Sequence, residues 1–274
     1  LTERLENGTY DFETLQRDLE KIAAAVFMKG NLKPAAIGDE DAVKQADKRI
    51  ASIGDSLEEA GADFFELPEF SIQQEMPYEG WSTNTSVSFV GQAFQTVRLT
   101  HEDAPALAVI SKLLRSLYLH KEIREKGGAY GGFALYNTEE GIFSFGSYRD
   151  PNITRTIDVY DKACDFIKSG DYSDDDIKEA VLQVCADIDK PETEGPASVK
   201  AYYRSLMNLS DEKRQKFKAA LLAITRDHIK KAAATYFDIS ADKKGTAVIS
   251  SKTMLENVNS GLAEGQRSLE LHRI

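Results

Sequence analysis

The residues between Arg124 and Gly132 form the densest group of chemically useful side chains in the sequence. Arg124 and Tyr130 are six residues apart, across a loop that contains Gly127 and Gly128. A guanidinium and a phenolic O–H are both hydrogen-bond donors, so together they suit a peptide carbonyl, a carboxylate or a developing oxyanion. The pair is therefore a candidate binding site for such an acceptor.

Two other interpretations of the same glycine-rich loop have to be weighed. The first is a phosphate-binding loop, but neither Gly-x-x-x-x-Gly-Lys-Ser/Thr nor Gly-x-Gly-x-x-Gly occurs, and the loop follows a helix instead of a strand. The second is purely structural, with Gly127 ending a helix before a tight hairpin. Arg124 and Tyr130 favour a functional loop over this structural alternative.

Metal-binding and nucleophilic motifs are missing from the sequence. The four histidines, His101, His120, His228 and His272, have no metal-ligand spacing, and both His-Glu-x-x-His and His-x-x-Glu-His are absent. There is no Gly-x-Ser-x-Gly elbow. Cys164 and Cys185 lack the surroundings that lower a thiol pKa, and we expect two reduced thiols without a bridge. No metal ligands are therefore predicted in this chain.

A run of carboxylates, Asp171 and Asp174 to Asp176, is a further candidate for cation binding. A calcium loop would need alternating ligands and a closing Glu, which are absent. Ser173 with Asp176 three residues later is instead typical of a helix N-terminus, where negative charge complements the helix dipole. We predict a capped helix here.

Composition limits the partners. The 274 residues carry 34 Lys+Arg and 45 Asp+Glu, a net charge of −11. This acidity argues against nucleic acid and anionic lipid as main partners and leaves basic peptides plausible. The longest apolar run, residues 22–28, is too short to span a bilayer, and no signal peptide opens the chain. We expect a cytoplasmic or organelle-matrix protein without membrane contact.

Hydrophobic periodicity predicts the elements that would position the loop. Helices are expected over 11–28, 42–54, 153–168, 173–188, 197–209, 211–223 and 225–236, with another from about 103 into the glycine-rich loop and a short one after 250. Strands are expected over 32–37, 84–99, 133–136, 142–148, 245–250 and 269–274, and 60–80 is expected to be a long connection. Short turns between strands and a block of helices indicate an α+β fold, an antiparallel β-sheet with helices packed on it.

Three segments resemble one known family. Residues 119–131, LHKEIREKGGAYG, resemble the Arg-x-Lys-Gly-Gly-Ala-Tyr-Gly segment in the C-terminal half of pitrilysin/insulinase-type zinc metallopeptidases, with the presequence-protease-like branch the nearest. Residues 87–91, VSFVG, and 31–39, NLKPAAIGD, are similar to strands of the same module. The resemblance implies an α+β module over 31–274, preceded over 1–30 by the helical end of another module.

The resemblance also implies a function. Such enzymes close two halves around a peptide, and the first module carries the zinc ligands. Arg124 would hold the substrate backbone or a carboxylate, Tyr130 would hydrogen-bond the scissile carbonyl region as a catalytic residue, and Gly127 and Gly128 would line the substrate site. Because the zinc motif is absent, zinc is expected only in the full-length enzyme, and this chain, with Leu at position 1, is expected to be an inactive C-terminal fragment that needs an N-terminal catalytic half.

Two alternatives remain open at this stage. The chain could be a natural non-catalytic subunit that pairs with a zinc-bearing partner. It could also be a structural or protein-interaction module that no longer binds peptides, in which case Arg124 and Tyr130 would be dispensable for proteolysis.

Overall fold

A computed structural model describes residues 4, 6–9, 11–59, 75–263 and 265–274. The chain divides into two compact units, which are described separately. The first contains the described residues within Leu1–Ile72 together with Glu192–Met207, and the second contains those within Gln73–Pro191 and Asn208–Ile274. The segment 60–74, most of the predicted long connection, lies outside the described residues.

The first unit is helical. It contains α2 (Phe12–Val26), the 3-10 turn η1 (Lys29–Asn31), α3 (Glu40–Ser56) and α8 (Glu194–Leu206). Asp11 and Asp39 cap α2 and α3 by accepting backbone N–H groups of the first turn. The strand predicted over 32–37 is wrong, because these residues form irregular backbone. Pro34 removes a donor there, and none of the strands in the described ranges pairs with the segment.

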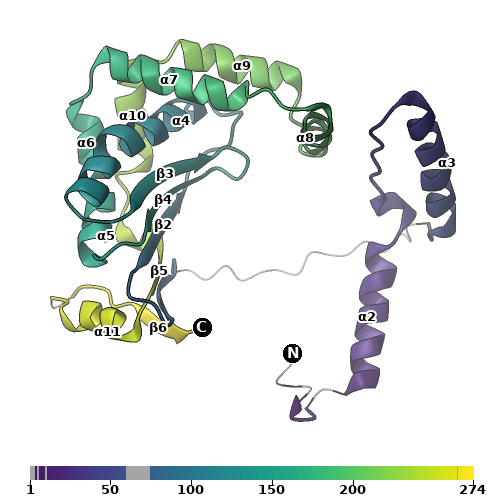
Figure 1. The fold of residues 1–274 in the computed structure, drawn as a ribbon, viewed down its shortest axis with the longest axis horizontal. Helices are drawn as coiled ribbons and strands as arrows, with labels where there is room; N and C mark the ends of the chain where they lie inside the picture. The colour runs from purple at the N-terminus through teal and green to yellow at the C-terminus, as the bar shows by residue number, and fades with distance from the viewer. Residues whose placement is uncertain (1–3, 5, 10, 60–74, 264) are drawn as a thin grey trace. The chain divides into compact units, whose positions relative to one another are not determined.

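The second unit is built on a six-stranded sheet with the order β3-β4-β2-β5-β1-β6 (Figure 1). The strands are β1 (Tyr78–Ser82), β2 (Phe89–Gln95), β3 (Gly131–Asn137), β4 (Ile142–Tyr148), β5 (Gly245–Ser250) and β6 (Glu270–Arg273). The pairs β3–β4, β4–β2 and β2–β5 are antiparallel, as predicted, which confirms the α+β class. However, β1 pairs in parallel with both β5 and β6, and the sheet is therefore mixed.

Helices cover one face of this sheet (Figure 1). They are α4 (Ala104–Leu113), its π-type continuation η2 (Leu114–Glu125), α5 (Thr154–Asp161), α6 (Ala163–Ser169), α7 (Asp174–Ile188), α9 (Asp211–Leu222) and α10 (Arg226–Tyr236), with α11 (Lys252–Ser260) near β1. Apart from the split at 162, which divides the helix predicted over 153–168, the helical block matches the predicted one.

The core lies between the sheet and these helices. On β2, Val90 and Phe94 are buried and face inward, whereas the alternating residues of that strand are half-buried or, at Gln95, exposed. Phe143 of β4 stacks on Phe94 at 5.6 Å between ring centroids, and Phe237 packs edge-on against Phe143 at 4.7 Å. Burial on one face only leaves the other face of the sheet accessible around Ile249.

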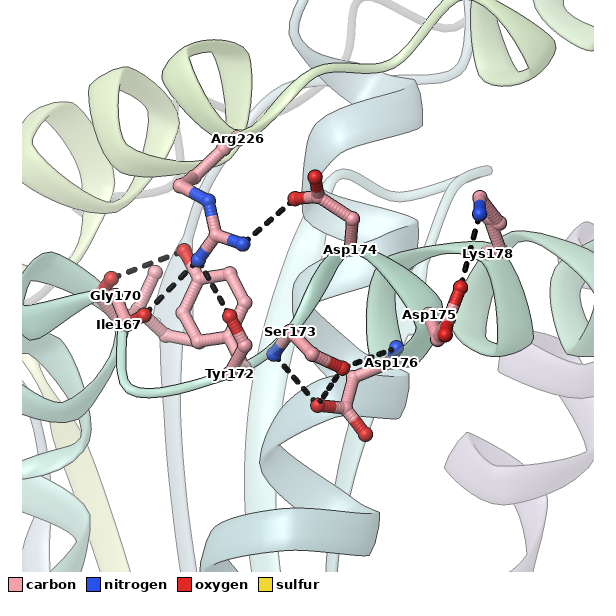
Figure 2. Close-up of polar contacts among 9 residues, drawn as sticks. All are labelled: Ile167, Gly170, Tyr172, Ser173, Asp174, Asp175, Asp176, Lys178 and Arg226. Carbon is pink, nitrogen blue, oxygen red and sulfur yellow. Dashed lines mark hydrogen bonds and ion pairs between the residues drawn. The ribbon is translucent and has the colours of Figure 1, made fainter.

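The carboxylate run lies at the start of α7 (Figure 2). Asp176 accepts the backbone N–H of Ser173 at 2.6 Å and its hydroxyl at 2.7 Å, while the Asp176 N–H donates to the Ser173 oxygen at 3.1 Å. These bonds form a reciprocal capping box, and they confirm the predicted helix cap.

Arg226 of α10 contacts the α6–α7 corner, the turn between α6 and the start of α7 (Figure 2). Its guanidinium donates to the Gly170 carbonyl at 2.9 Å and also to the Tyr172 carbonyl, and it pairs with Asp174 at 2.7 Å. It also lies over the Tyr172 ring, 4.9 Å from the centroid. One side chain therefore satisfies two carbonyls of the α6–α7 turn.

Candidate functional site

The glycine-rich loop connects the end of η2 to β3. Gly128 N–H donates to the Arg124 carbonyl at 3.0 Å, and Ala129 N–H donates to the Ile123 carbonyl at 3.1 Å. The N–H groups of the loop therefore cap the C-terminal end of η2. A Cβ on Gly127 would lie 2.4 Å from the Ile123 carbonyl oxygen, and Gly128 has φ +76°. Both positions therefore require glycine for the shape of the loop.

Side chains of the segment that follows β4 hold this loop in place through hydrogen bonds. Asn152 donates its side-chain N–H to the Gly127 carbonyl at 2.6 Å, and Arg155 donates to the Lys126 carbonyl at 2.9 Å. Asp150, whose side chain is fully buried, accepts the Asn152 backbone N–H at 2.8 Å and the Thr156 hydroxyl at 2.6 Å. The loop conformation is thus fixed by side chains that are more than twenty residues later in the sequence.

Tyr130 stands at the surface at the end of this loop. Its side chain is 70% exposed, and its backbone N–H donates to the Tyr148 carbonyl at 3.1 Å. The ring packs edge-on against that of Tyr148, with centroids 5.7 Å apart, and Tyr148 packs in the same way against Phe89 at 5.3 Å. Within the described ranges the Tyr130 hydroxyl has no hydrogen-bond partner, so it is available to an external acceptor.

Arg124 lies in the last turn of η2 and is exposed. Its carbonyl accepts the Gly128 N–H, which joins it to the loop, but its guanidinium has no acceptor among the residues that the structure describes. The structure therefore places Arg124 and Tyr130 at the two ends of one braced loop, each with a free donor group. One backbone group of each of Gly127 and Gly128 already has a partner, in Asn152 and Arg124, and the part of these glycines in substrate binding stays a prediction.

Sequence patterns did not reveal Tyr148, Arg149 and Asn152, which surround the loop. They reach it through the hairpin register, in which Gly131 pairs with Tyr148. The only local signal was the turn chemistry of Asp150-Pro151-Asn152 directly after a strand, which is typical of a rigid turn. That pattern gives no indication of which loop the turn supports.

The histidines and cysteines do not gather into a metal centre. Across the described part of the chain, no group of three or more His, Cys, Asp or Glu side chains could hold a metal ion. His120, for example, pairs locally with Glu125 at 3.4 Å, and His228 completes the capping box of α10. Cys164 and Cys185 are free thiols. In the same part of the chain no helix is long and apolar enough to cross a membrane.

Comparison with known proteins gives related sequences. The mitochondrial presequence protease of Xenopus tropicalis is 37% identical over 169 residues, which cover 62% of this chain and 16% of that protein. The corresponding protein of Eremothecium gossypii is 34% identical over 235 residues, covering 82% of this chain and 23% of that protein. The chain thus spans about a quarter or less of the length of these relatives.

Solved structures share the fold at low sequence identity. A protease from Helicobacter pylori matches with a TM-score of 0.64 and 16% identity, over 88% of this chain and 59% of that one. An inactive M16 peptidase domain from Pseudomonas fluorescens matches with a TM-score of 0.54 and 15% identity, over 88% and 53%. Pitrilysin matches with a TM-score of 0.54 and 11% identity, over 86% and 25%.

A family model described as the PreP C-terminal domain matches residues 79–253, which include all of the glycine-rich loop and all of the sheet except β6 and the first residue of β1. This match covers more than half of the chain, and it agrees with the resemblance seen in residues 119–131. The chain therefore belongs to the PreP C-terminal domain family, and the relatives named above are presequence proteases.

Proposed function

We propose that this chain is the part of a zinc metalloendopeptidase that binds and orients the peptide but does not hold the zinc. The names of the related sequences and the M16 fold support this assignment. The metal would be held by an N-terminal catalytic half, and the substrates would be peptides enclosed between the halves. The relatives named as mitochondrial support an organelle matrix as the compartment.

Arg124 and Tyr130 are the residues that would bind the peptide through hydrogen bonds. Arg124 would donate to a backbone carbonyl or carboxylate of the peptide, and Tyr130 would donate its O–H to the scissile carbonyl region, where negative charge develops. The observation that supports this most directly is that both donors are exposed, lack an acceptor among the described residues and belong to one loop fixed by Asn152 and Arg155. A fixed donor needs little reorganisation during the reaction.

The test uses the protease assembled from this chain and its catalytic half, with a fluorogenic peptide. Tyr130→Phe is expected to lower kcat/KM by roughly 10²–10³-fold, because one transition-state donor is lost, and Arg124→Ala is expected to lower it as well. Thermal unfolding should be unchanged, since neither side chain packs in the core. This chain alone, with added zinc, is expected to show no turnover.

Matched controls separate the loop from general surface effects. The control for Tyr130→Phe is Tyr203→Phe, which removes the hydroxyl of another exposed tyrosine, 59% exposed. The control for Arg124→Ala is Arg98→Gln, which removes an exposed charge near the first residue of β4. Both should leave kcat/KM within about twofold, as ordinary surface changes do. Full activity in Arg124→Ala and Tyr130→Phe would reject the proposal and favour a structural module, and zinc-dependent turnover by the pure chain would reject its dependence on a second half.

A further inference from the structure

Arg149 is in an unusual backbone conformation directly after β4. Its φ is +50°, and among the described residues it shares a positive φ outside glycine only with Asn208. Asparagine adopts this region comparatively easily, whereas for arginine the left-handed conformation costs about 1–2 kcal/mol. A glycine would adopt the same turn without that cost, so the turn itself does not explain the arginine.

The neighbours of Arg149 hold it in this conformation. Tyr148 on one side accepts the Tyr130 N–H at 3.1 Å and is the last residue of β4. Asp150 on the other side exchanges both backbone hydrogen bonds with Ser88, each at 2.8 Å, and its side chain is buried. Because both flanking residues are fixed, the direction of the Arg149 side chain is fixed at the backbone as well.

That direction places the Arg149 guanidinium over the ring of Tyr148, the residue against which Tyr130 packs. Its central carbon lies 5.7 Å from the centroid of the Tyr148 ring, and the same ring lies 5.7 Å from that of Tyr130. Arg149 is exposed, and no carboxylate pairs with it in the ranges that the structure covers. The adjacent Asp150 does not neutralise it through a side-chain contact, because its two carboxylate oxygens accept from Asn152 and Thr156.

We propose that Arg149 is a specificity residue that binds a carboxylate of the peptide held at Tyr130; this rests on the function proposed above. A guanidinium placed over an aromatic ring keeps its N–H edge free for a bidentate carboxylate. Two successive separations of 5.7 Å correspond to at most three or four residues of extended peptide at ~3.3 Å each. The carboxylate would thus belong to an acidic side chain near the scissile bond or to the C-terminus of a short product.

The proposal is tested by peptide binding to this chain, measured by fluorescence anisotropy at low ionic strength. One peptide pair differs by Glu or Gln two residues from the cleavage position, and a second pair ends in a carboxylate or an amide, which separates the two sources. The wild type is expected to bind the carboxylate member of at least one pair about tenfold more tightly. Arg149→Gly should abolish this difference, Arg149→Lys should retain part of it, and Arg98→Gln should retain all of it.

The outcomes are separable from those of the proposed function. If the wild type does not discriminate within either pair, or if Arg149→Gly discriminates as the wild type does, the assignment of Arg149 is wrong. Arg149→Gln serves as a second neutral variant if the glycine variant does not fold. Activity loss in Tyr130→Phe with unchanged discrimination in Arg149→Gly would leave the proposed function intact and overturn only the role of Arg149.

Discussion

The four glycines of the loop differ in what surrounds them, and this allows a sharp prediction from Gly127→Ala. A Cβ at this position would lie 2.4 Å from the Ile123 carbonyl oxygen and 3.1 Å from that of Glu122, and ordinary contact begins at 3.4 Å. The obstacle is helix backbone and not a movable side chain. The loop must therefore shift by about 1 Å away from η2.

Two effects determine how much Gly127→Ala lowers the free energy of unfolding. Overpacking against a fixed neighbour typically costs 1–3 kcal/mol, and a shift of this size also weakens the bond of about 1 kcal/mol from Asn152 to the Gly127 carbonyl. We expect the free energy of unfolding of Gly127→Ala to fall by about 2–3 kcal/mol, which corresponds to a Tm about 5–10 °C lower. If the proposed function holds, kcat/KM in the assembled protease should also fall by about 10²-fold, because the shift moves Arg124 relative to Tyr130.

Gly131→Ala is the matched control, four residues away at the first position of β3. No atom lies within 4 Å of a Cβ at Gly131, and its φ is not in the left-handed region. Its Tm should change by less than about 2 °C, or rise slightly, because alanine restricts the unfolded chain. Differential scanning fluorimetry of both variants is sufficient. Equal Tm values for the two variants would show that the loop is not fixed against η2, and the reasoning from the Ile123 carbonyl would fail.

The remaining predictions concern the α6–α7 corner. Arg226→Ala should lower the free energy of unfolding by about 2 kcal/mol in chemical denaturation, because it leaves the Gly170 and Tyr172 carbonyls unpaired. The control variant Lys178→Ala breaks only an exposed ion pair and should have almost no effect on that free energy. Equal losses in the two variants would contradict the role of Arg226. The Ser173 hydroxyl and then its N–H lower the pKa of Asp176 below 3.8, so its contribution is present above that pH and is lost as the pH falls below it. Between pH 6 and 3, Tm should therefore fall less in Asp176→Asn than in the wild type.

Local patterns predicted the parts of the fold whose partners are close in sequence. The hairpin of β3 and β4 was predicted because two apolar runs flank Asn137 to Gly141, and the cap of α7 was predicted from Ser173 and Asp176. β1 was missed because Pro77 and Gly80 indicate a connection, although Tyr78 and Trp81 favour a strand. Its pairing with β5 and β6 provides the strand geometry, and no local pattern indicates a parallel neighbour.

The residues of the site, like the elements of the fold, were predictable only where the signal lies within one short segment. Arg124 and Tyr130 could be selected because their chemistry and the glycines lie within one short segment. Arg149 could not, because an exposed arginine after a strand is common, and its positive φ lies between two residues whose backbone partners, Tyr130 and Ser88, are distant in sequence. Asn152 could not either, since its partner is the carbonyl of Gly127, and a carbonyl carries no sequence signal.

The position of β5 between β2 and β1 has a consequence for how the protein is made. During synthesis, β2, β3 and β4 can pair soon after they emerge, but one edge of β2 has no partner until β5 appears, and Ser82 bonds to a residue 190 positions later. Until then an apolar strand edge is open to pairing with other chains. Refolding should therefore be slow and should lose yield as protein concentration rises, and chaperones that shield strand edges should restore it.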